Sequence, residues 1–139
     1  MLSPADTSKI CPRLTHITFA VKNLDESIEF YIGWLGLEVH LDRRPKGRTV
    51  WMTTKEQNGS SPPEFVFVLE EGEVSKINHF GFQVESLTEL DRIALEASKA
   101  DILMEGPVHI GGVVGSYVFV RDPSGHIWEY THGQPLRGL

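Results

Sequence analysis

The chain contains a single cysteine, Cys11, so it can form no intrachain disulfide and has no cysteine cluster of the zinc-binding kind. It also has no apolar stretch near the roughly 20 residues that a membrane-spanning helix needs. Residues 1–12 lack the apolar core of a secretory signal peptide. These absences predict a cytoplasmic protein that has no membrane partner.

The chain has fewer basic than acidic side chains. It contains 13 Lys and Arg and 19 Asp and Glu, which gives a net charge of −6. Nucleic-acid binding needs a basic surface, so nucleic acid is excluded as a main partner. The local exception is a run formed by Arg43, Arg44, Lys46 and Arg48. We interpret this run as a solvated hairpin, with attraction of an anionic ligand as the alternative.

An internal repeat is present at an offset of 63 residues. Residues 14–27 align with residues 77–90 and share five identities in fourteen positions. The identical pairs are His16 and His79, Phe19 and Phe82, Val21 and Val84, Leu24 and Leu87, and Glu26 and Glu89. A repeat of this kind indicates that the chain is built from two related halves.

Each half is expected to begin with a strand that leads into a helix. His16, Thr18 and Ala20 alternate with apolar residues, which is the period of a half-buried strand. Asn23 and Ser86 are N-cap candidates, because a glutamate follows each of them three residues later. The second helix is expected to bury Leu87, Leu90, Ala94, Leu95 and Ala97. Three further strands are predicted after each helix, at Leu37–Asp42, Thr49–Thr53 and Glu64–Leu69, and at Ile102–Met104, Ser116–Arg121 and His126–Thr131.

The predicted fold class is α+β, with two paired βαβββ modules that form a cupped mixed sheet. The length of 139 residues fits one domain, which we expect over residues 13–132. Module one is predicted at residues 13–71 and module two at residues 76–132. Residues 1–12 are expected to form an N-terminal arm and residues 133–139 a C-terminal tail.

Two histidines and one glutamate are the candidate metal ligands. His16 and His79 lie at equivalent positions of the two first strands, so a twofold pairing of the halves would bring them together. Glu129 lies among apolar residues of the last strand, where a carboxylate needs a partner. Two imidazoles and one carboxylate on three strands form a facial triad, which suits Fe(II), with Mn(II), Ni(II) or Zn(II) as alternatives. We therefore predict one divalent metal ion at His16, His79 and Glu129.

A histidine in a strand is more often structural than a ligand, and a lone glutamate is usually solvated. The coincidence of two histidines in register favours the metal site over this reading. The other strand and turn histidines, His40, His126 and His132, are expected to be turn or surface residues.

Three segments of the chain resemble the vicinal oxygen chelate superfamily, which includes glyoxalase I, bleomycin-resistance proteins, fosfomycin-resistance proteins and extradiol dioxygenases. They are LTHITFAVKNLDESIEFYIGWLGLEV (14–39), INHFGFQV (77–84) and VRDPSGHIWEY (120–130). The resemblance implies paired βαβββ modules that form a cupped sheet around a metal site, and it assigns the metal positions to His16, His79 and Glu129. Single-domain members often build each site from modules of two chains, so a homodimer is expected.

Two departures from this pattern bear on the reaction. Glyoxalase I has a fourth ligand, a glutamate on the last strand of its first half, and an internal offset of 62 aligns Phe67 with that position. Glu64 and Glu70 lie three residues to either side of Phe67 and so have the wrong strand parity. Extradiol dioxygenases place a tyrosine ten residues before the metal glutamate, where this chain has Phe119. Tyr117, two residues away on the same face, is a possible substitute.

The leading hypothesis is a metal-dependent lyase or extradiol-type dioxygenase that acts on a small molecule with vicinal oxygens. Trp51, Phe67, Tyr117 and Phe119 are expected to contact the substrate, and Tyr117 and His109 are the candidate catalytic side chains. The alternative is a metal-free small-molecule or drug-binding protein of the bleomycin-resistance kind. A third reading is a structural or regulatory module in which the histidine pair is a relic. Because bleomycin-resistance-like members lack the metal set, its presence here favours the enzyme.

Overall fold

The computed structural model describes residues 14–59 and 62–136, and within them the chain repeats the order strand, helix and three strands. The first repeat contains β1 (His16–Val21), α2 (Leu24–Leu35), β2 (Leu37–Asp42), β3 (Thr49–Thr54) and β4 (Val66–Glu71). The second contains β5 (Phe80–Gln83), α3 (Leu87–Lys99), β6 (Leu103–Gly111), β7 (Gly115–Arg121) and β8 (Ile127–His132). The α+β fold with two βαβββ modules is confirmed, whereas the expected arm at residues 1–12 lies outside the described residues.

Each repeat forms its own four-stranded mixed sheet. Sheet A has the order β1-β4-β3-β2, and sheet B has the equivalent order β5-β8-β7-β6. β1 pairs with β4 in parallel, as β5 does with β8, and the remaining pairs are antiparallel. The first strand of each module therefore lies at a sheet edge, next to the last strand of the same module.

The two helices begin at the side-chain caps that the sequence predicts. The Asn23 side-chain oxygen accepts a hydrogen bond from the Glu26 backbone N–H at 3.0 Å. The Ser86 hydroxyl oxygen accepts one from the Glu89 backbone N–H at 3.1 Å. Gly36 ends α2 in the left-handed conformation, with φ of 64°, which a glycine adopts without strain.

One part of the predicted face of α3 is wrong. Leu87 and Leu95 are 46% and 57% exposed, whereas Ile93, which the prediction omitted, is 7% exposed. The buried positions Leu90, Ile93, Ala94 and Ala97 follow the i, i+3, i+4, i+7 spacing of one helix face, and Leu95 falls outside this stripe.

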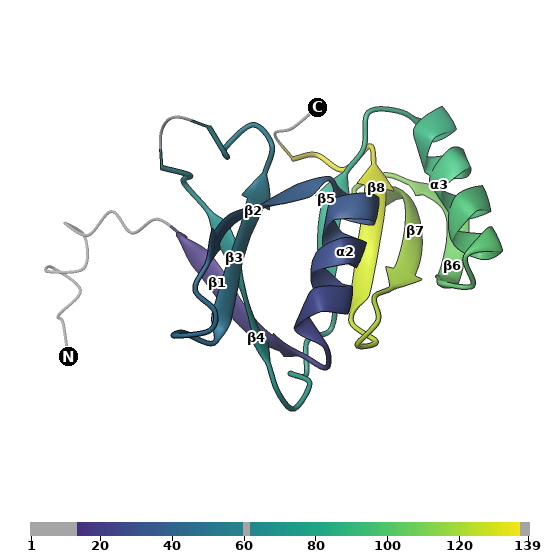
Figure 1. The fold of residues 1–139 in the computed structure, drawn as a ribbon. Helices are drawn as coiled ribbons and strands as arrows, with labels where there is room; N and C mark the ends of the chain where they lie inside the picture. Colours follow the sequence, from purple (N-terminus) through teal and green to yellow (C-terminus); the bar gives the residue numbers. More distant parts are fainter. Residues whose placement is uncertain (1–13, 60–61, 137–139) are drawn as a thin grey trace, which may run out of the picture.

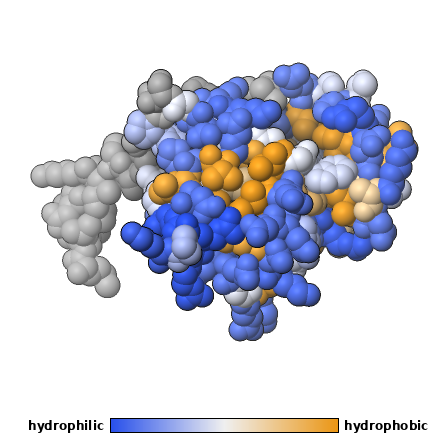
Figure 2. Space-filling model, viewed as in Figure 1, coloured by the Kyte–Doolittle hydropathy of each residue, from blue (hydrophilic) through white to orange (hydrophobic). Residues whose placement is uncertain are grey.

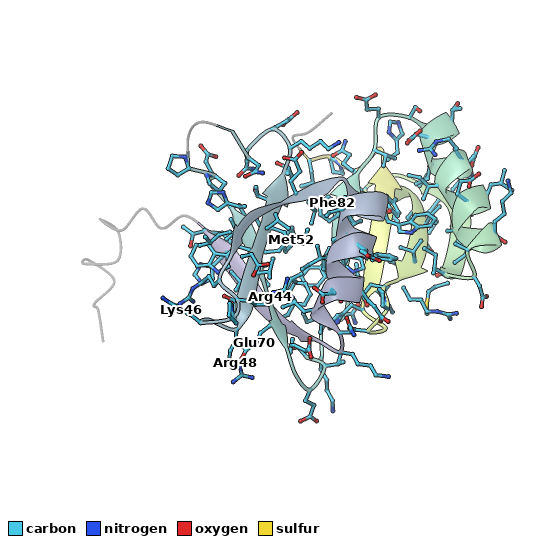
Figure 3. The ribbon with its side chains drawn as sticks, in the orientation of Figure 1. Arg44, Lys46, Arg48, Met52, Glu70 and Phe82 are labelled. Carbon is cyan, nitrogen blue, oxygen red and sulfur yellow. The ribbon has the colours of Figure 1, made fainter. Side chains whose placement is uncertain are left out.

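The apolar faces of the two sheets meet in one shared core. Helix α2 lies between sheet A and sheet B, and α3 covers the outer side of sheet B (Figure 1). Met52 of β3 is fully buried and lies between sheet A and α2 (Figure 3). Aromatic rings join the modules: Phe19 lies 5.0 Å from Phe80 between ring centroids, and Tyr31 of α2 lies 5.0 Å from Trp128. The modules therefore pack as one body.

Hydrogen bonds reinforce this contact between modules. The Tyr31 hydroxyl of α2 donates to the Asp122 carboxylate at 2.5 Å, and the Trp128 indole N–H donates to the same oxygen at 3.3 Å. Burial and the neighbouring Asp122 carboxylate raise the pKa of Tyr31. His126, expected at the surface or in the turn, is 3% exposed, and its Nε2 lies 2.9 Å from the Ala20 carbonyl oxygen. The turn after β7 in module two therefore contacts β1 of module one through His126.

The described part of the chain contains no helix with the length and apolarity needed to cross a bilayer.

Candidate functional site

His79 and Glu129 lie side by side on one face of sheet B. Glu129 belongs to β8, and His79 immediately precedes β5, the strand that pairs with β8. His79 Nε2 is 3.5 Å from Glu129 Oε2. The carboxylate side chain is 11% exposed and the imidazole is 39% exposed. The Glu129 carboxylate is therefore largely buried, and the more exposed imidazole of His79 lies beside it.

The other ring nitrogen of His79 has a partner of its own. His79 Nδ1 lies 2.6 Å from the Asn78 side-chain oxygen, which can only accept a hydrogen bond. In the neutral imidazole this contact places the proton on Nδ1 and leaves a lone pair on Nε2, facing the carboxylate. Metal-bound histidines show the same pattern, in which the second nitrogen donates to an outer acceptor.

The spacing of the two atoms also fits a shared metal ion. Ligand atoms that lie about 2.1 Å from one ion are about 3.0 Å apart in octahedral geometry and about 3.4 Å apart in tetrahedral geometry. The observed Nε2–Oε2 distance of 3.5 Å is close to the second value. A Cβ atom at Gly81 would lie 3.4 Å from Glu129 Oε2, so the glycine leaves the space beside the carboxylate open.

Aromatic side chains complete this face of sheet B. Phe119 pairs with Glu129 across the ladder, and its ring lies 5.3 Å from the His79 ring. Tyr117 is two residues away on the same face, and its hydroxyl donates to Glu105 at 3.5 Å. Partial burial, then the Glu105 carboxylate, and last the Glu129 carboxylate raise the pKa of Tyr117. Its hydroxyl is therefore protonated and able to donate at neutral pH.

His16 lies on the corresponding face of sheet A, where it lines a cavity of about 690 Å³. The cavity is lined by Thr15, His16, Thr18, His40, Arg43, Thr49, Trp51, Pro62, Pro63, Glu64, Val66 and Val68. Its volume lies within the roughly 300–1,000 Å³ of small-molecule sites. Trp51, which is predicted to contact the substrate, lines this cavity.

One chain does not bring the three predicted ligands together. Over residues 14–59 and 62–136, no three side chains of the metal-ligating types gather into a group. The reason is the packing of the modules. Phe19 and Phe80 face the shared core, so His16, on the other face of β1, points away from the face of sheet B that carries Glu129. The pair His79 and Glu129 is formed within the chain, and His16 is not added to it.

The predicted equivalence of Phe67 and Glu129 is wrong by one residue. In the ladders Thr18 pairs with Val68, and Gly81 pairs with Glu129, so Val68 is the equivalent of Glu129. Strand side chains alternate between faces, and a slip of one residue exchanges core and cavity.

Phe67 is accordingly a core residue and not a cavity-lining one. Its ring lies 5.9 Å from Phe80 and 5.8 Å from Trp128. Glu64 has the wrong strand parity relative to Phe67, but it has the same parity as Val68. It lines the cavity together with Val68.

His109 lies on the opposite face of sheet B from Glu129. Its Nδ1 is 2.8 Å from the Ser116 hydroxyl oxygen, and its Nε2 is 3.8 Å from the Asp91 carboxylate of α3. Ser116 and Glu129 belong to opposite sets of the β7–β8 ladder, so His109 faces α3 while Tyr117 faces Glu129.

Three residues of this region are not among the predicted site residues. Asn78 was not singled out, although a polar side chain directly before a candidate ligand is a signal for an outer hydrogen-bond partner. Thr18 was placed on the His16 face by the alternation of β1, but it was not named as a cavity residue. Arg43 was noted only as one of a basic run.

Comparison with known proteins agrees with the fold. The family model for the Glyoxalase/Bleomycin resistance protein/Dioxygenase superfamily matches residues 13–130. An uncharacterized protein of Pseudomonas aeruginosa is 36% identical over 133 residues, which cover 90% of this chain and 91% of that protein.

Solved structures that share the architecture include the following two. Fosfomycin resistance protein FosX from Listeria monocytogenes superposes with a TM-score of 0.71 at 19% identity, over 91% of this chain and 94% of its own. An integron cassette protein from the mobile metagenome of the Halifax Harbour sewage outfall does so with a TM-score of 0.65 at 25% identity, over 88% and 99%. The chain therefore belongs to the glyoxalase/bleomycin resistance protein/dioxygenase superfamily.

Proposed function

We propose that the protein is a metal-dependent enzyme that acts on a small molecule with two adjacent oxygen atoms. The observation that carries this proposal is the pair formed by His79 and Glu129. An imidazole nitrogen and a buried carboxylate oxygen lie 3.5 Å apart, and Asn78 directs the lone pair of the imidazole toward that oxygen. A divalent cation between them would satisfy both groups.

The third ligand in this proposal is His16 of a second chain. Within one chain His16 faces a different cavity, so a complete triad requires a partner. β1 and β5 are edge strands, and edge strands offer backbone groups to a neighbouring chain. A twofold homodimer that sets β1 of one chain beside β5 of the other would build two equivalent sites, each with His16 from one subunit and His79 and Glu129 from its partner.

The metal proposed is divalent, with Fe(II) favoured and Mn(II), Ni(II) or Zn(II) as alternatives. When bound, such an ion supplies Lewis-acid chemistry to the adjacent oxygens of a substrate. The chain itself contributes Tyr117, whose protonated hydroxyl can donate to a substrate oxygen, and Phe119, which packs against His79. Val68 stands where a fourth carboxylate ligand would lie, so three protein ligands leave positions open for the substrate.

Lyase and extradiol-type dioxygenase are the reaction classes that this site would support. Neither matches in every residue. The fourth-ligand position is the apolar Val68, and the position opposite Glu129 is Phe119, which has no hydroxyl to donate. Tyr117 is the nearest donor on that face, and its role stays a prediction.

The test is the metal content of protein purified without a metal-affinity tag, measured by mass spectrometry. We expect about one Fe, Mn, Ni or Zn per chain in the wild type. His16→Ala and His79→Ala should each lose most of this metal. His40→Ala is the matched control, because His40 lines the same cavity as His16 but is not a proposed ligand. A wild type that holds no metal and takes up none from added divalent ions would refute the proposal.

A metal-free binding protein is the second candidate, and the cavity on sheet A is the observation in its favour. That cavity is built by one chain and is of ligand size without any contribution from a metal. If this candidate is correct, small molecules should raise the melting temperature of chelator-treated protein as much as that of untreated protein.

A further inference from the structure

The basic run that follows β2 does not act as one uniform patch. Arg44 is neutralised by two carboxylates, because its guanidinium lies 2.8 Å from Asp25 and 2.8 Å from Asp42. Arg48 lies 3.3 Å from Glu70. These side chains gather at the turn between β2 and β3, which forms a strongly hydrophilic part of the surface (Figures 2 and 3). Two members of the run therefore have local partners.

Arg43 differs from both neighbours in its partner and in its location. It lines the cavity that contains His16 and Trp51, and it forms no ion pair with any residue in the described part of the chain. Glu64 lines the same cavity, and no ion pair joins it to Arg43. Among the residues that the structure describes, Arg43 is thus the one arginine or lysine that lines this cavity, and none of them neutralises its charge.

The turn holds the backbone of Arg43 in place. Its N–H donates to the Thr49 carbonyl at 3.1 Å, and the Gly47 N–H donates to the Arg43 carbonyl at 2.7 Å. A Cβ at Gly47 would lie 2.8 Å from the Arg43 Cβ, so only glycine fits beside it. Hydrogen bonds from Arg44 hold the pKa of Asp42 at about 2, so the ion pair between Asp42 and Arg44 is fully charged at neutral pH. The backbone of Arg43 therefore has a fixed position in the turn between β2 and β3.

The rest of the cavity is mainly apolar. Trp51, Val66 and Val68 come from the strands, and Pro62 and Pro63 come from the segment before β4. A ligand that fills this space needs an apolar or aromatic body. A guanidinium at its wall favours a planar anion, which it can bind through two parallel hydrogen bonds.

We infer that Arg43 is a specificity-determining residue that binds a carboxylate carried by an apolar or aromatic small molecule. This inference rests on the proposed function in one respect, since it makes the cavity around His16 the substrate site. It assigns to that substrate a negative charge in addition to its adjacent oxygens. The Arg43 side chain contacts the carboxylate and takes no part in the chemistry.

The experiment compares phenylacetate with phenylacetamide, its neutral isostere, by isothermal titration calorimetry. The wild type should bind phenylacetate at least about tenfold more tightly than phenylacetamide. Arg43→Gln should remove this preference and leave phenylacetamide binding unchanged. Arg48→Gln is the matched control, because it removes the same charge from the same turn at a residue that does not line the cavity. It should retain the preference.

Repeating the titrations on chelator-treated protein, with metal content measured on each sample, separates this inference from the proposed function. An Arg43-dependent preference in protein that never holds metal would support the inference while the proposed function fails. A preference that disappears with the metal and is unaffected by Arg43→Gln would assign anion binding to the metal and overturn the inference. Wild-type protein that binds no phenylacetate, or Arg48→Gln losing as much as Arg43→Gln, would overturn it equally.

Discussion

The imidazole of His79 is oriented by the residue that precedes it in the sequence. Asn78 accepts from Nδ1 at 2.6 Å, and this contact leaves Nε2 free to face Glu129 at 3.5 Å. An outer hydrogen bond of this kind sets both the tautomer and the rotation of a ligand histidine. At the scale of single residues, Asn78 therefore orients the imidazole that we propose as a metal ligand.

Asn78→Ala is expected to weaken metal binding roughly 10- to 100-fold without unfolding the protein, because the ligand loses its orienting partner. Competition with a chelator of known affinity measures the change. Asn58→Ala is the control, since Asn58 accepts in the same way from Nδ1 of His40, which is not a proposed ligand, at 3.2 Å. Equal metal affinities for wild type and Asn78→Ala would show that the contact does not serve the metal.

At the scale of elements, the hairpin of β6 and β7 depends on the conformation of its glycines. Gly112 and Gly115 both have positive φ, at 59° and 69°. Their surroundings differ, because a Cβ at Gly112 would meet nothing within 4 Å, whereas one at Gly115 would lie 2.3 Å from the His132 carbonyl oxygen. Gly115 therefore also allows β7 and the end of β8 to approach closely.

The two glycines give a matched pair of substitutions. Gly112→Ala should lower the free energy of unfolding by about 1 kcal/mol, the strain of a left-handed alanine. Gly115→Ala adds a backbone collision to this strain and should cost roughly 3 kcal/mol or more. Urea denaturation followed by circular dichroism measures both changes. Equal losses in the two variants would mean that the close approach of β7 to β8 contributes nothing to stability.

At the scale of the whole molecule, the packing of the two modules decides where the site can form. The apolar faces of both sheets are used in one core, so the faces that carry His16 and Glu129 point in different directions. Our proposal that a second chain completes the triad rests on this arrangement, and not on any property of the individual strands.

Mixed dimers test this arrangement directly. Co-expressed His16→Ala and Glu129→Gln chains should recover about a quarter of the wild-type metal content, because about half of the dimers are mixed and each has one intact site. His79→Ala with Glu129→Gln should recover none, since both changes fall in the same module and every site is damaged. If the first mixture also holds no metal, the site is not shared between chains.

The sequence by itself determined the features that depend on local interactions. The caps at Asn23 and Ser86, the turn after β7 and the alternation of β1 all involve residues within a few positions of one another. The internal repeat then placed His16 and His79 at equivalent positions of the two modules. The ladders agree, because His16 lies two residues before Thr18 and His79 lies two residues before Gly81, its equivalent.

Tertiary structure alone decided the features that depend on distant residues. The register of β4 against β1 put Val68, and not Phe67, opposite Thr18, because the apolar ring of Phe67 is held by Phe80 and Trp128 from the other module. Arg44 pairs with Asp25 across 19 residues, whereas its neighbour Arg43 lines the cavity. Such choices depend on which surfaces meet, and the energy of burying them is realised only when the whole chain is packed.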